Sequence, residues 1–268
     1  MSSADGTWIE VAERVFARRH AELDLTTGLV VGDETALLID TRGDHRQGAE
    51  LAEAVGRITR APLRIALTHG HFDHCFGTSA FLPAPVWAHE RCPAHLARTA
   101  ADQREHWVSH YRTTGDTDTA DALAASSPTA PDHLVTDRVD LDLGGRTAQL
   151  RHFGLGHTDH DLVVAIPDAA VAFAGDLVEQ GAPPDFGEAR LDRWPATLEA
   201  MLAIGPAVVV PGHGSPVGPE FVRTQRDEIA ELATLREELL AGRVTREEAV
   251  RRSPYPEETT SAVLTREF

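Results

Sequence analysis

The sequence predicts an α/β fold, a four-layer αββα sandwich of two mixed β-sheets with helices on the outer faces. Short apolar runs occur in pairs joined by hairpin-type turns, and amphipathic helical segments are interleaved with these pairs. This alternation favours two mixed sheets over one doubly wound sheet. No linker divides the chain, so we expect one domain over residues 1–268, with a core over about 8–216 and a helical extension over 217–268.

The expected strands are short runs rich in apolar and β-branched residues. The turns Gly32-Asp33 and Gly144-Gly145 mark two hairpins, because glycine supplies the backbone conformations that tight turns need. In chain order, strands are expected over residues 8–17 as one strand or a pair, 23–41 as a hairpin, 63–68, 85–89, 139–154 as a second hairpin, 162–166, 171–174 and 207–210.

The expected helices carry apolar residues at helical spacing. Pro195 stands near the start of one of them, where its missing N–H would have no intrahelical partner. The polar, alanine-rich residues 90–127 contain no motif, and we expect them to lie over the functional site. In chain order, helices are expected over residues 45–58, 73–82, 90–127 as one or two helices with a mobile connection, 191–204 and 219–240.

The charge balance is strongly acidic: 25 basic and 42 acidic residues give a net charge of −17, and every basic residue is an arginine. A polyanionic partner normally needs a basic surface, so no nucleic-acid partner is expected. No apolar run is long enough for a membrane span, and no signal peptide is visible. With only two cysteines, Cys75 and Cys92, the protein is expected to be reduced and cytoplasmic. A homodimer is left open.

The stretch THGHFDHCFG, residues 68–77, concentrates metal-ligand side chains directly after an apolar run. Neutral histidine offers a nitrogen lone pair to a metal. His69 and His71, two residues apart on extended chain, point to the same side and can grip one metal ion. Asp73 and His74 lie where the chain turns into a helix and face another direction. The stretch therefore has the pattern of half of two adjacent metal sites.

Three later residues share a second pattern: His157, Asp176 and His213 each follow an apolar strand and a glycine. Ligands at the ends of several strands can converge at one edge of a sheet. Each residue alone has a plainer interpretation, such as a surface histidine, a turn aspartate or, for Asp73, a helix N-cap. Because the same pattern recurs at several strand ends, we interpret the residues together as one metal-binding set.

The motifs HGHFDH (69–74), GHTDHD (156–161), AGDLV (174–178) and PGHG (211–214), preceded by the strand-terminal Asp40, resemble those of the metallo-β-lactamase-fold hydrolase superfamily. They occur in the order of that family and span roughly residues 8–216. The resemblance implies two metal ions, by default Zn²⁺, although mixed histidine and carboxylate ligation leaves iron or manganese open. The ligands that it implies are His69, His71 and His157 for the first ion, Asp73, His74 and His213 for the second, and Asp176 as a bridge.

Three residues are expected to act beside pure ligation. Asp40 should orient a ligand histidine or a loop backbone. Asp73, as the resemblance implies, could also move a proton to the leaving group. His160 follows His157 by three residues in the same loop, and we expect it to contact the substrate. The remaining histidines are expected to be exposed or hydrogen-bonded, and Cys75 to be a buried packing residue.

The resemblance implies a hydrolase in which a metal-bridging hydroxide attacks an ester, thioester, lactone or lactam of a small molecule. Arg190 or Arg193 could anchor a substrate carboxylate, since lysine is absent. Two other activities of the same fold stay open: a mononuclear iron persulfide dioxygenase, and a phosphodiesterase or ribonuclease. A scaffold without activity ranks last, because no ligand of the expected set is missing.

Overall fold

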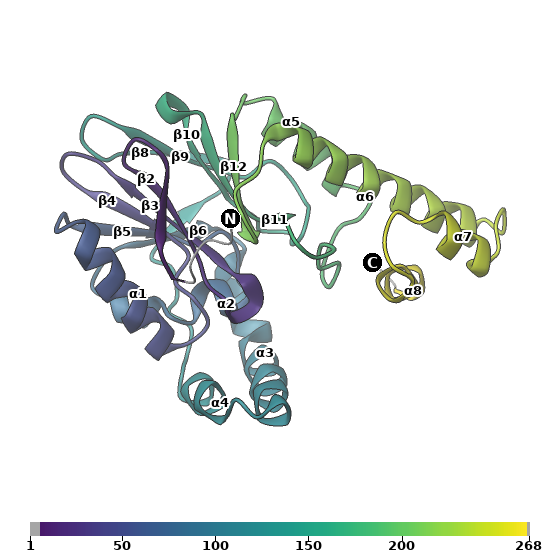
Figure 1. Ribbon diagram of the computed structural model, residues 1–268, viewed down its shortest axis with the longest axis horizontal. Coiled ribbons are helices and arrows are strands. Elements are labelled where there is room, and N and C mark those ends of the chain that lie inside the picture. The colour runs from purple at the N-terminus through teal and green to yellow at the C-terminus, as the bar shows by residue number, and fades with distance from the viewer. Residues whose placement is uncertain (1–5, 267–268) are drawn as a thin grey trace.

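The computed structural model describes residues 6–266 and shows two β-sheets packed against each other with helices on their outer faces (Figure 1). This arrangement confirms the predicted class, two mixed sheets with helices. Helices α1, α3 and α4 lie on the side of the first sheet, and α5 and α6 lie on the side of the second. None of the helices in the described part of the chain combines the length and the apolar character that a bilayer span needs.

The first sheet has seven strands in the order β1-β2-β3-β4-β5-β6-β7. The pairs from β1 to β4 are antiparallel and those from β4 to β7 are parallel, so the sheet is mixed. The short β7 was not predicted. The strands are β1 Trp8–Ala12, β2 Val15–Arg19, β3 Thr26–Val31, β4 Ala36–Ile39, β5 Leu63–Ala66, β6 Val86–His89 and β7 His133–Val135.

The second sheet has five strands in the order β12-β11-β10-β9-β8, with β11 and β12 parallel and the other pairs antiparallel. Strands β11 and β12 run past their predicted ends because their parallel pairing resumes after an irregularity at Gly175, whose φ is +53°. Asp176 therefore lies within β11, and His213 is the last residue of β12. The strands are β8 Arg138–Asp142, β9 Thr147–Arg151, β10 Val163–Ile166, β11 Val171–Glu179 and β12 Val208–His213.

The helices expected over 45–58, 191–204 and 219–240 are present, and the 90–127 segment contains two helices. The single helix expected over 73–82 is wrong: the chain forms a four-residue helix and a separate 3-10 turn there, and two short helices follow in the C-terminal extension. Helix α1 begins after Asp44, whose carboxylate accepts hydrogen bonds from the backbone N–H groups of Arg46 and Gln47. The helices are α1 His45–Ile58, α2 Phe72–Cys75, α3 Cys92–Thr114, α4 Thr117–Ala124, α5 Trp194–Leu202, α6 Pro219–Leu240, α7 Arg246–Arg252 and α8 Glu257–Thr265, with 3-10 turns η1 Glu22–Asp24, η2 Thr78–Phe81 and η3 Pro167–Ala169.

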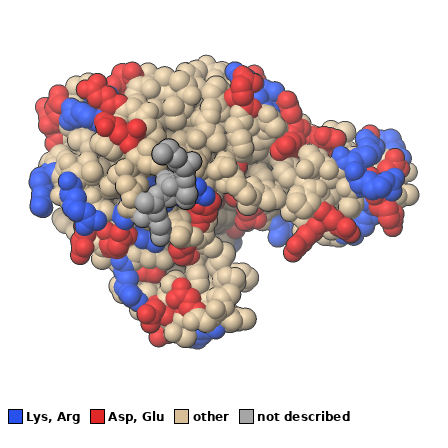
Figure 2. Space-filling model, viewed as in Figure 1, with Lys and Arg blue, Asp and Glu red and all other residues tan. Residues whose placement is uncertain are grey.

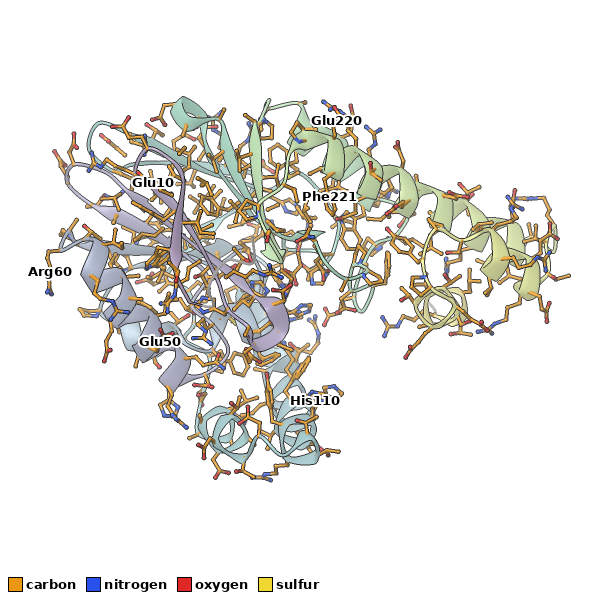
Figure 3. The ribbon with its side chains drawn as sticks, in the orientation of Figure 1. Glu10, Glu50, Arg60, His110, Glu220 and Phe221 are labelled. Atoms are coloured by element: carbon orange, nitrogen blue, oxygen red, sulfur yellow. The ribbon has the colours of Figure 1, made fainter. Side chains whose placement is uncertain are left out.

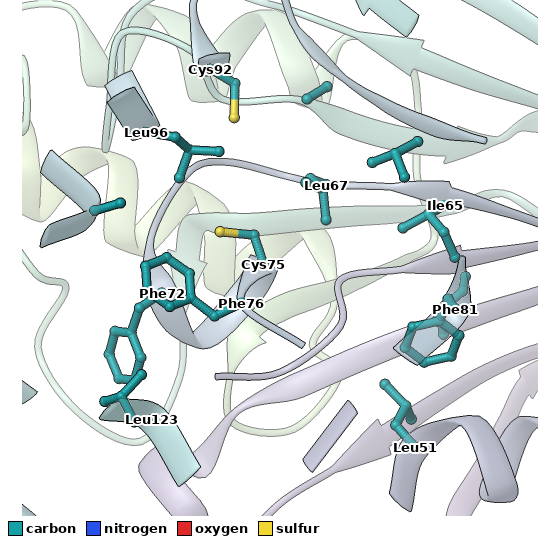
Figure 4. Close-up of a cluster of buried hydrophobic side chains, with 14 of the residues drawn as sticks. Leu51, Ile65, Leu67, Phe72, Cys75, Phe76, Phe81, Cys92, Leu96 and Leu123 are labelled. Atoms are coloured by element: carbon teal, nitrogen blue, oxygen red, sulfur yellow. The ribbon is translucent and has the colours of Figure 1, made fainter. Parts of the chain in front are cut away.

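Three apolar layers hold the four structural layers together. The middle layer joins the sheets, for example through Leu37 of β4 and Phe173 of β11. The outer layer on the first sheet contains Cys75 and Cys92, which are buried free thiols, and Figure 4 shows both among apolar side chains. Burial raises the pKa of the Cys92 thiol to about 12, so it is an apolar packing group at neutral pH.

Charged side chains such as Arg60 and Glu220 lie at the periphery of the molecule (Figure 3). On the face shown in Figure 2, acidic and basic groups form small separate patches rather than one basic field. The apolar layers therefore lie inside the sandwich, and the charged side chains lie on its surface.

Candidate metal centre

The loop between β5 and α2 carries His69 and His71 into the interior. Its glycine cannot be replaced without moving other side chains, because a Cβ on Gly70 would lie 2.7 Å from His95 Cδ2 and 3.0 Å from His160 Nε2. The Gly70 N–H donates to His160 Nε2 at 3.0 Å, which fixes the loop. His69 and His71 thus lie in a packed loop directly after the strand, where the sequence analysis expected extended chain.

One cluster consists of His69, His71, His157 and Asp176, whose ligand atoms all lie within 4.8 Å of one another. His157 Nε2 is 3.0 Å from His71 Nδ1. Asp176 Oδ2 lies 3.6 Å from the Nε2 atoms of both His69 and His157. His69, His157 and Asp176 are almost wholly buried, so this site lies in the interior of the protein.

A second cluster consists of Asp73, His74 and His213. Asp73 Oδ2 lies 3.4 Å from His213 Nε2 and 3.5 Å from His74 Nε2. Asp176 adjoins this cluster as well, with Oδ1 3.2 Å from His74 Nε2 and Oδ2 3.3 Å from His213 Nε2. Asp176 therefore lies between the two clusters, where a bridging ligand would lie.

The two clusters fit divalent cations. Within the described residues, His69 Nε2 and Asp176 Oδ1 are buried and have no hydrogen-bond partner. Burial lowers the pKa of His69 and of His71 well below the usual value, so both imidazoles are neutral ligands. Burial raises the pKa of Asp176, but the neighbouring His74 and His213 outweigh it and hold that pKa well below its usual value. A cation in each cluster would accept lone pairs from the imidazole nitrogens and carboxylate oxygens around it.

Hydrogen bonds behind the ligands orient the ring nitrogens. His157 Nδ1 is 3.1 Å from the carbonyl oxygen of Asp185, and His213 Nδ1 is 2.8 Å from that of Leu23. Because a carbonyl only accepts, each Nδ1 carries the proton and each Nε2 presents its lone pair to the clusters. This pairing with backbone carbonyls cannot be seen in the sequence motifs.

Asp40 lies behind His74, at the end of β4, with a φ of +61°. Its Oδ2 accepts a hydrogen bond from His74 Nδ1 at 2.8 Å and another from Thr68 Oγ1 at 2.8 Å. Its Oδ1 accepts the backbone N–H of Thr68 at 2.8 Å. Asp40 is only 1% exposed, so this carboxylate fixes both a ligand ring and the start of the ligand loop.

The family model of the metallo-beta-lactamase superfamily matches residues 23–213. The chain belongs to this superfamily. A metallo-beta-lactamase type 2 from Bacteroides fragilis is 32% identical over 97 residues, which are 34% of this chain and 39% of that protein. One from Bacillus sp. (strain 170) is 25% identical over 197 residues, 70% of this chain and 66% of that protein. The chain thus spans less than two thirds of the length of these relatives.

The solved metallo-beta-lactamase from Pontibacter korlensis has a TM-score of 0.66 and 19% identity, and the match covers 82% of this chain and 98% of that one. At this identity the likeness shows the fold alone. The superfamily assignment agrees with the predicted class of metal-dependent hydrolase, and the clusters are candidate sites for the metal ions of that class.

His160 does not lie where a residue that contacts the substrate would lie. It is fully buried, its Nε2 accepts the Gly70 N–H, and its Nδ1 is 2.8 Å from Asp159 Oδ1. Both ring nitrogens are therefore used inside the protein. The substrate contact predicted for His160 is wrong, and the residue holds the ligand loop instead.

A cavity of about 400 Å³ opens onto the two clusters. Where it meets them, it is lined by His71, Asp73, Asp176 and His213. A site of this size suits a small molecule. Of its principal wall residues, only Phe72 lies within a sequence motif, and the expectation that residues 90–127 lie over the site pointed toward the α3 wall. The principal wall residues are Phe72, Gln103 and Trp107 on α2 and α3, and Glu179, Asp185 and Glu188 on β11 and the following loop.

The two arginines predicted as substrate anchors do not line this cavity. Arg193 Nε lies 3.1 Å from Asp192 Oδ2, and Arg190 Nε lies 3.9 Å from Asp192 Oδ1. The acidic residue between them pairs with both guanidinium groups. Neither arginine therefore lies at this cavity, and the carboxylate anchor stays a prediction.

Proposed function

We propose that the protein is a metal-dependent hydrolase that binds two divalent ions and cleaves an ester, thioester, lactone or lactam of a small molecule. The observation that carries this proposal is the position of Asp176 between two ligand clusters, within 3.6 Å of a histidine nitrogen in each. In this proposal His69, His71 and His157 would hold one ion, and Asp73, His74 and His213 the other. When bound, two such metal ions lower the pKa of a water molecule that they hold and polarise a carbonyl oxygen of the substrate.

The side chains around the ions have defined tasks in this proposal. The bonds from His157 and His213 to backbone carbonyls, and from His74 to Asp40, keep the lone pairs aimed inward. Asp73 lines the cavity, so its carboxylate can also carry a proton to the leaving group.

Zinc is the proposed metal, because three neutral histidines and a carboxylate suit Zn²⁺. The test is metal quantification by mass spectrometry on the purified protein, followed by hydrolysis assays with a panel of aryl esters, thioesters, lactones and lactams. We expect two zinc equivalents per chain, loss of activity with a chelator, and recovery when zinc is returned.

Two outcomes would contradict the proposal. One iron per chain, with oxygen consumption on a persulfide substrate, would instead show the dioxygenase chemistry considered for this fold. Salt-sensitive RNA binding with RNA cleavage, and no turnover of the acyl panel, would instead show a nuclease.

A further inference from the structure

The loop that follows β11 presents two carboxylates to the cavity. Asp185 and Glu188 both line it and are exposed. The loop is fixed to the metal centre, because the Asp185 carbonyl oxygen accepts a hydrogen bond from the ligand His157 at 3.1 Å. The Asp185 N–H donates to Glu179 Oε1 at 2.7 Å, and the Gly187 N–H donates to Asp185 Oδ1 at 2.8 Å. The carboxylates are therefore held beside the clusters.

Among the described residues, no arginine forms an ion pair with either carboxylate, and Arg266 donates only to backbone carbonyl oxygens between them, those of Phe186 and Gly187. Asp24, also in the cavity lining, has both carboxylate oxygens bonded to Arg19. Glu188 has only histidines near it: Oε1 lies 4.0 Å from His71 Nε2, and Oε2 lies 3.4 Å from His95 Nδ1. Glu188 thus faces the cavity without an arginine partner.

Another part of the wall is aromatic. Phe72 and Trp107 both line the cavity, and their ring centroids lie 4.8 Å apart. Aromatic faces pack against the apolar part of a ligand, and they attract a cation through the ring quadrupole. The cavity therefore combines an aromatic wall with an acidic one.

We propose that this cavity selects acyl substrates that carry a positively charged amine or ammonium group and disfavours those that carry a carboxylate; this specificity rests on the proposed hydrolase function. The charge of two bound divalent ions would be met in part by Asp73 and Asp176. The carboxylates of Asp185 and Glu188 add two negative charges to the walls, and no arginine among the described residues lines the cavity. A substrate carboxylate thus finds no anchor on the walls, whereas a cation finds carboxylates and aromatic rings.

The size of the effect follows from Coulomb's law. A unit charge about 6 Å from one carboxylate changes binding about threefold even with the dielectric constant of water, so two carboxylates give about tenfold. Salt reduces the effect, since the Debye length is roughly 10 Å at 0.1 M. The preference is therefore best measured at low ionic strength.

The test uses three aryl esters with one leaving group and acyl chains of matched shape: 4-(trimethylammonio)butanoyl, the uncharged 5,5-dimethylhexanoyl, and glutaryl. For the metal-loaded protein we expect kcat/KM for the cationic ester to exceed that for the neutral ester about tenfold. The glutaryl ester should be the poorest substrate. In the double variant Asp185→Asn, Glu188→Gln, the cationic-to-neutral ratio should fall toward one.

Asp192→Asn is the matched control, because it removes one charge from the same loop outside the cavity lining and should leave the ratio unchanged. Calorimetric binding of the three corresponding amides tests the charge preference without turnover. Hydrolysis that favours glutaryl, or a ratio unchanged in the double variant, would overturn the charge selection and leave the hydrolase proposal standing. Cation-selective binding without hydrolysis of any acyl ester would overturn the hydrolase proposal and support the selectivity of the cavity.

Discussion

Replacing Asp40 by asparagine separates its role toward the metal ions from its role in the fold. The carboxylate accepts three hydrogen bonds, one of them from the ligand His74. Asparagine keeps one acceptor oxygen for the Thr68 N–H, but its amide nitrogen cannot accept the proton on His74 Nδ1. The ring of His74 then loses the partner that fixes its tautomer and orientation.

The expected loss can be stated for metal and fold separately. Removing the partner of a metal-bound histidine costs about 10–100-fold in metal affinity, which is about 1.4–2.7 kcal/mol. A buried donor left without an acceptor costs about 1–3 kcal/mol in the free energy of unfolding of the metal-free protein. The two quantities are measured by competition with a chromophoric chelator and by urea unfolding.

Asp44→Ala is the matched control for Asp40→Asn. Asp44 is equally buried, but it caps helix α1 and does not contact the ligand clusters. Its loss should lower the free energy of unfolding by about 1 kcal/mol and leave metal affinity unchanged. Metal affinity that is unchanged in Asp40→Asn, or that falls equally in Asp44→Ala, would refute the role assigned to Asp40.

Three further predictions concern other parts of the molecule. His71→Ala should lose metal and hydrolysis while circular dichroism shows a retained fold; full activity would show that the ligand assignment is wrong. Burial lowers the pKa of His20 to about 2, below its unfolded value, so the unfolded chain binds the proton first and stability falls as the pH falls below about 6.5. Between pH 6.5 and 5 this contributes about 2 kcal/mol, and urea unfolding should show a shallower pH dependence in His20→Gln. Arg266 donates hydrogen bonds to the carbonyl oxygens of Phe186 and Gly187, in the loop after β11 that carries Asp185 and Glu188. Arg266→Ala should therefore raise KM severalfold with little change in Tm. An unchanged KM would contradict this anchoring role.

The sequence predicted which histidines and aspartates lie close together, because the spacing within each motif reflects local chemistry. The same spacing could not give directions that depend on the tertiary fold. His160 lies three residues from His157, yet the turn between them, held by Thr158 and Asp161, sends the His160 ring inward to Gly70. Residues that are close in sequence can face opposite sides of a tight turn. The apolar periodicity of the sequence does not indicate which of these sides faces the cavity.

The fold class was predictable because apolar patterning decides which faces are buried. Strand ends were less predictable where pairing decides them. The apolar run of β11 stops at Ala174, but pairing with β12 carries the strand on to Glu179. The structure also places Arg190 and Arg193 outside the cavity lining, each beside Asp192, which apolar patterning does not indicate.

In the proposed function, metal binding would stabilise the packing of the two sheets, because the candidate ligand histidines are held from both. His74 is held by Asp40 at the end of β4 in the first sheet, whereas His213 ends β12 in the second sheet and bonds to the carbonyl of Leu23. An ion that binds both histidines therefore joins both sheets at one point. Any ligand that binds only the folded chain adds stability in proportion to the logarithm of its concentration over its Kd. Loss of metal should consequently loosen the contact between the sheets, and with it the loop through which His157 holds Asp185.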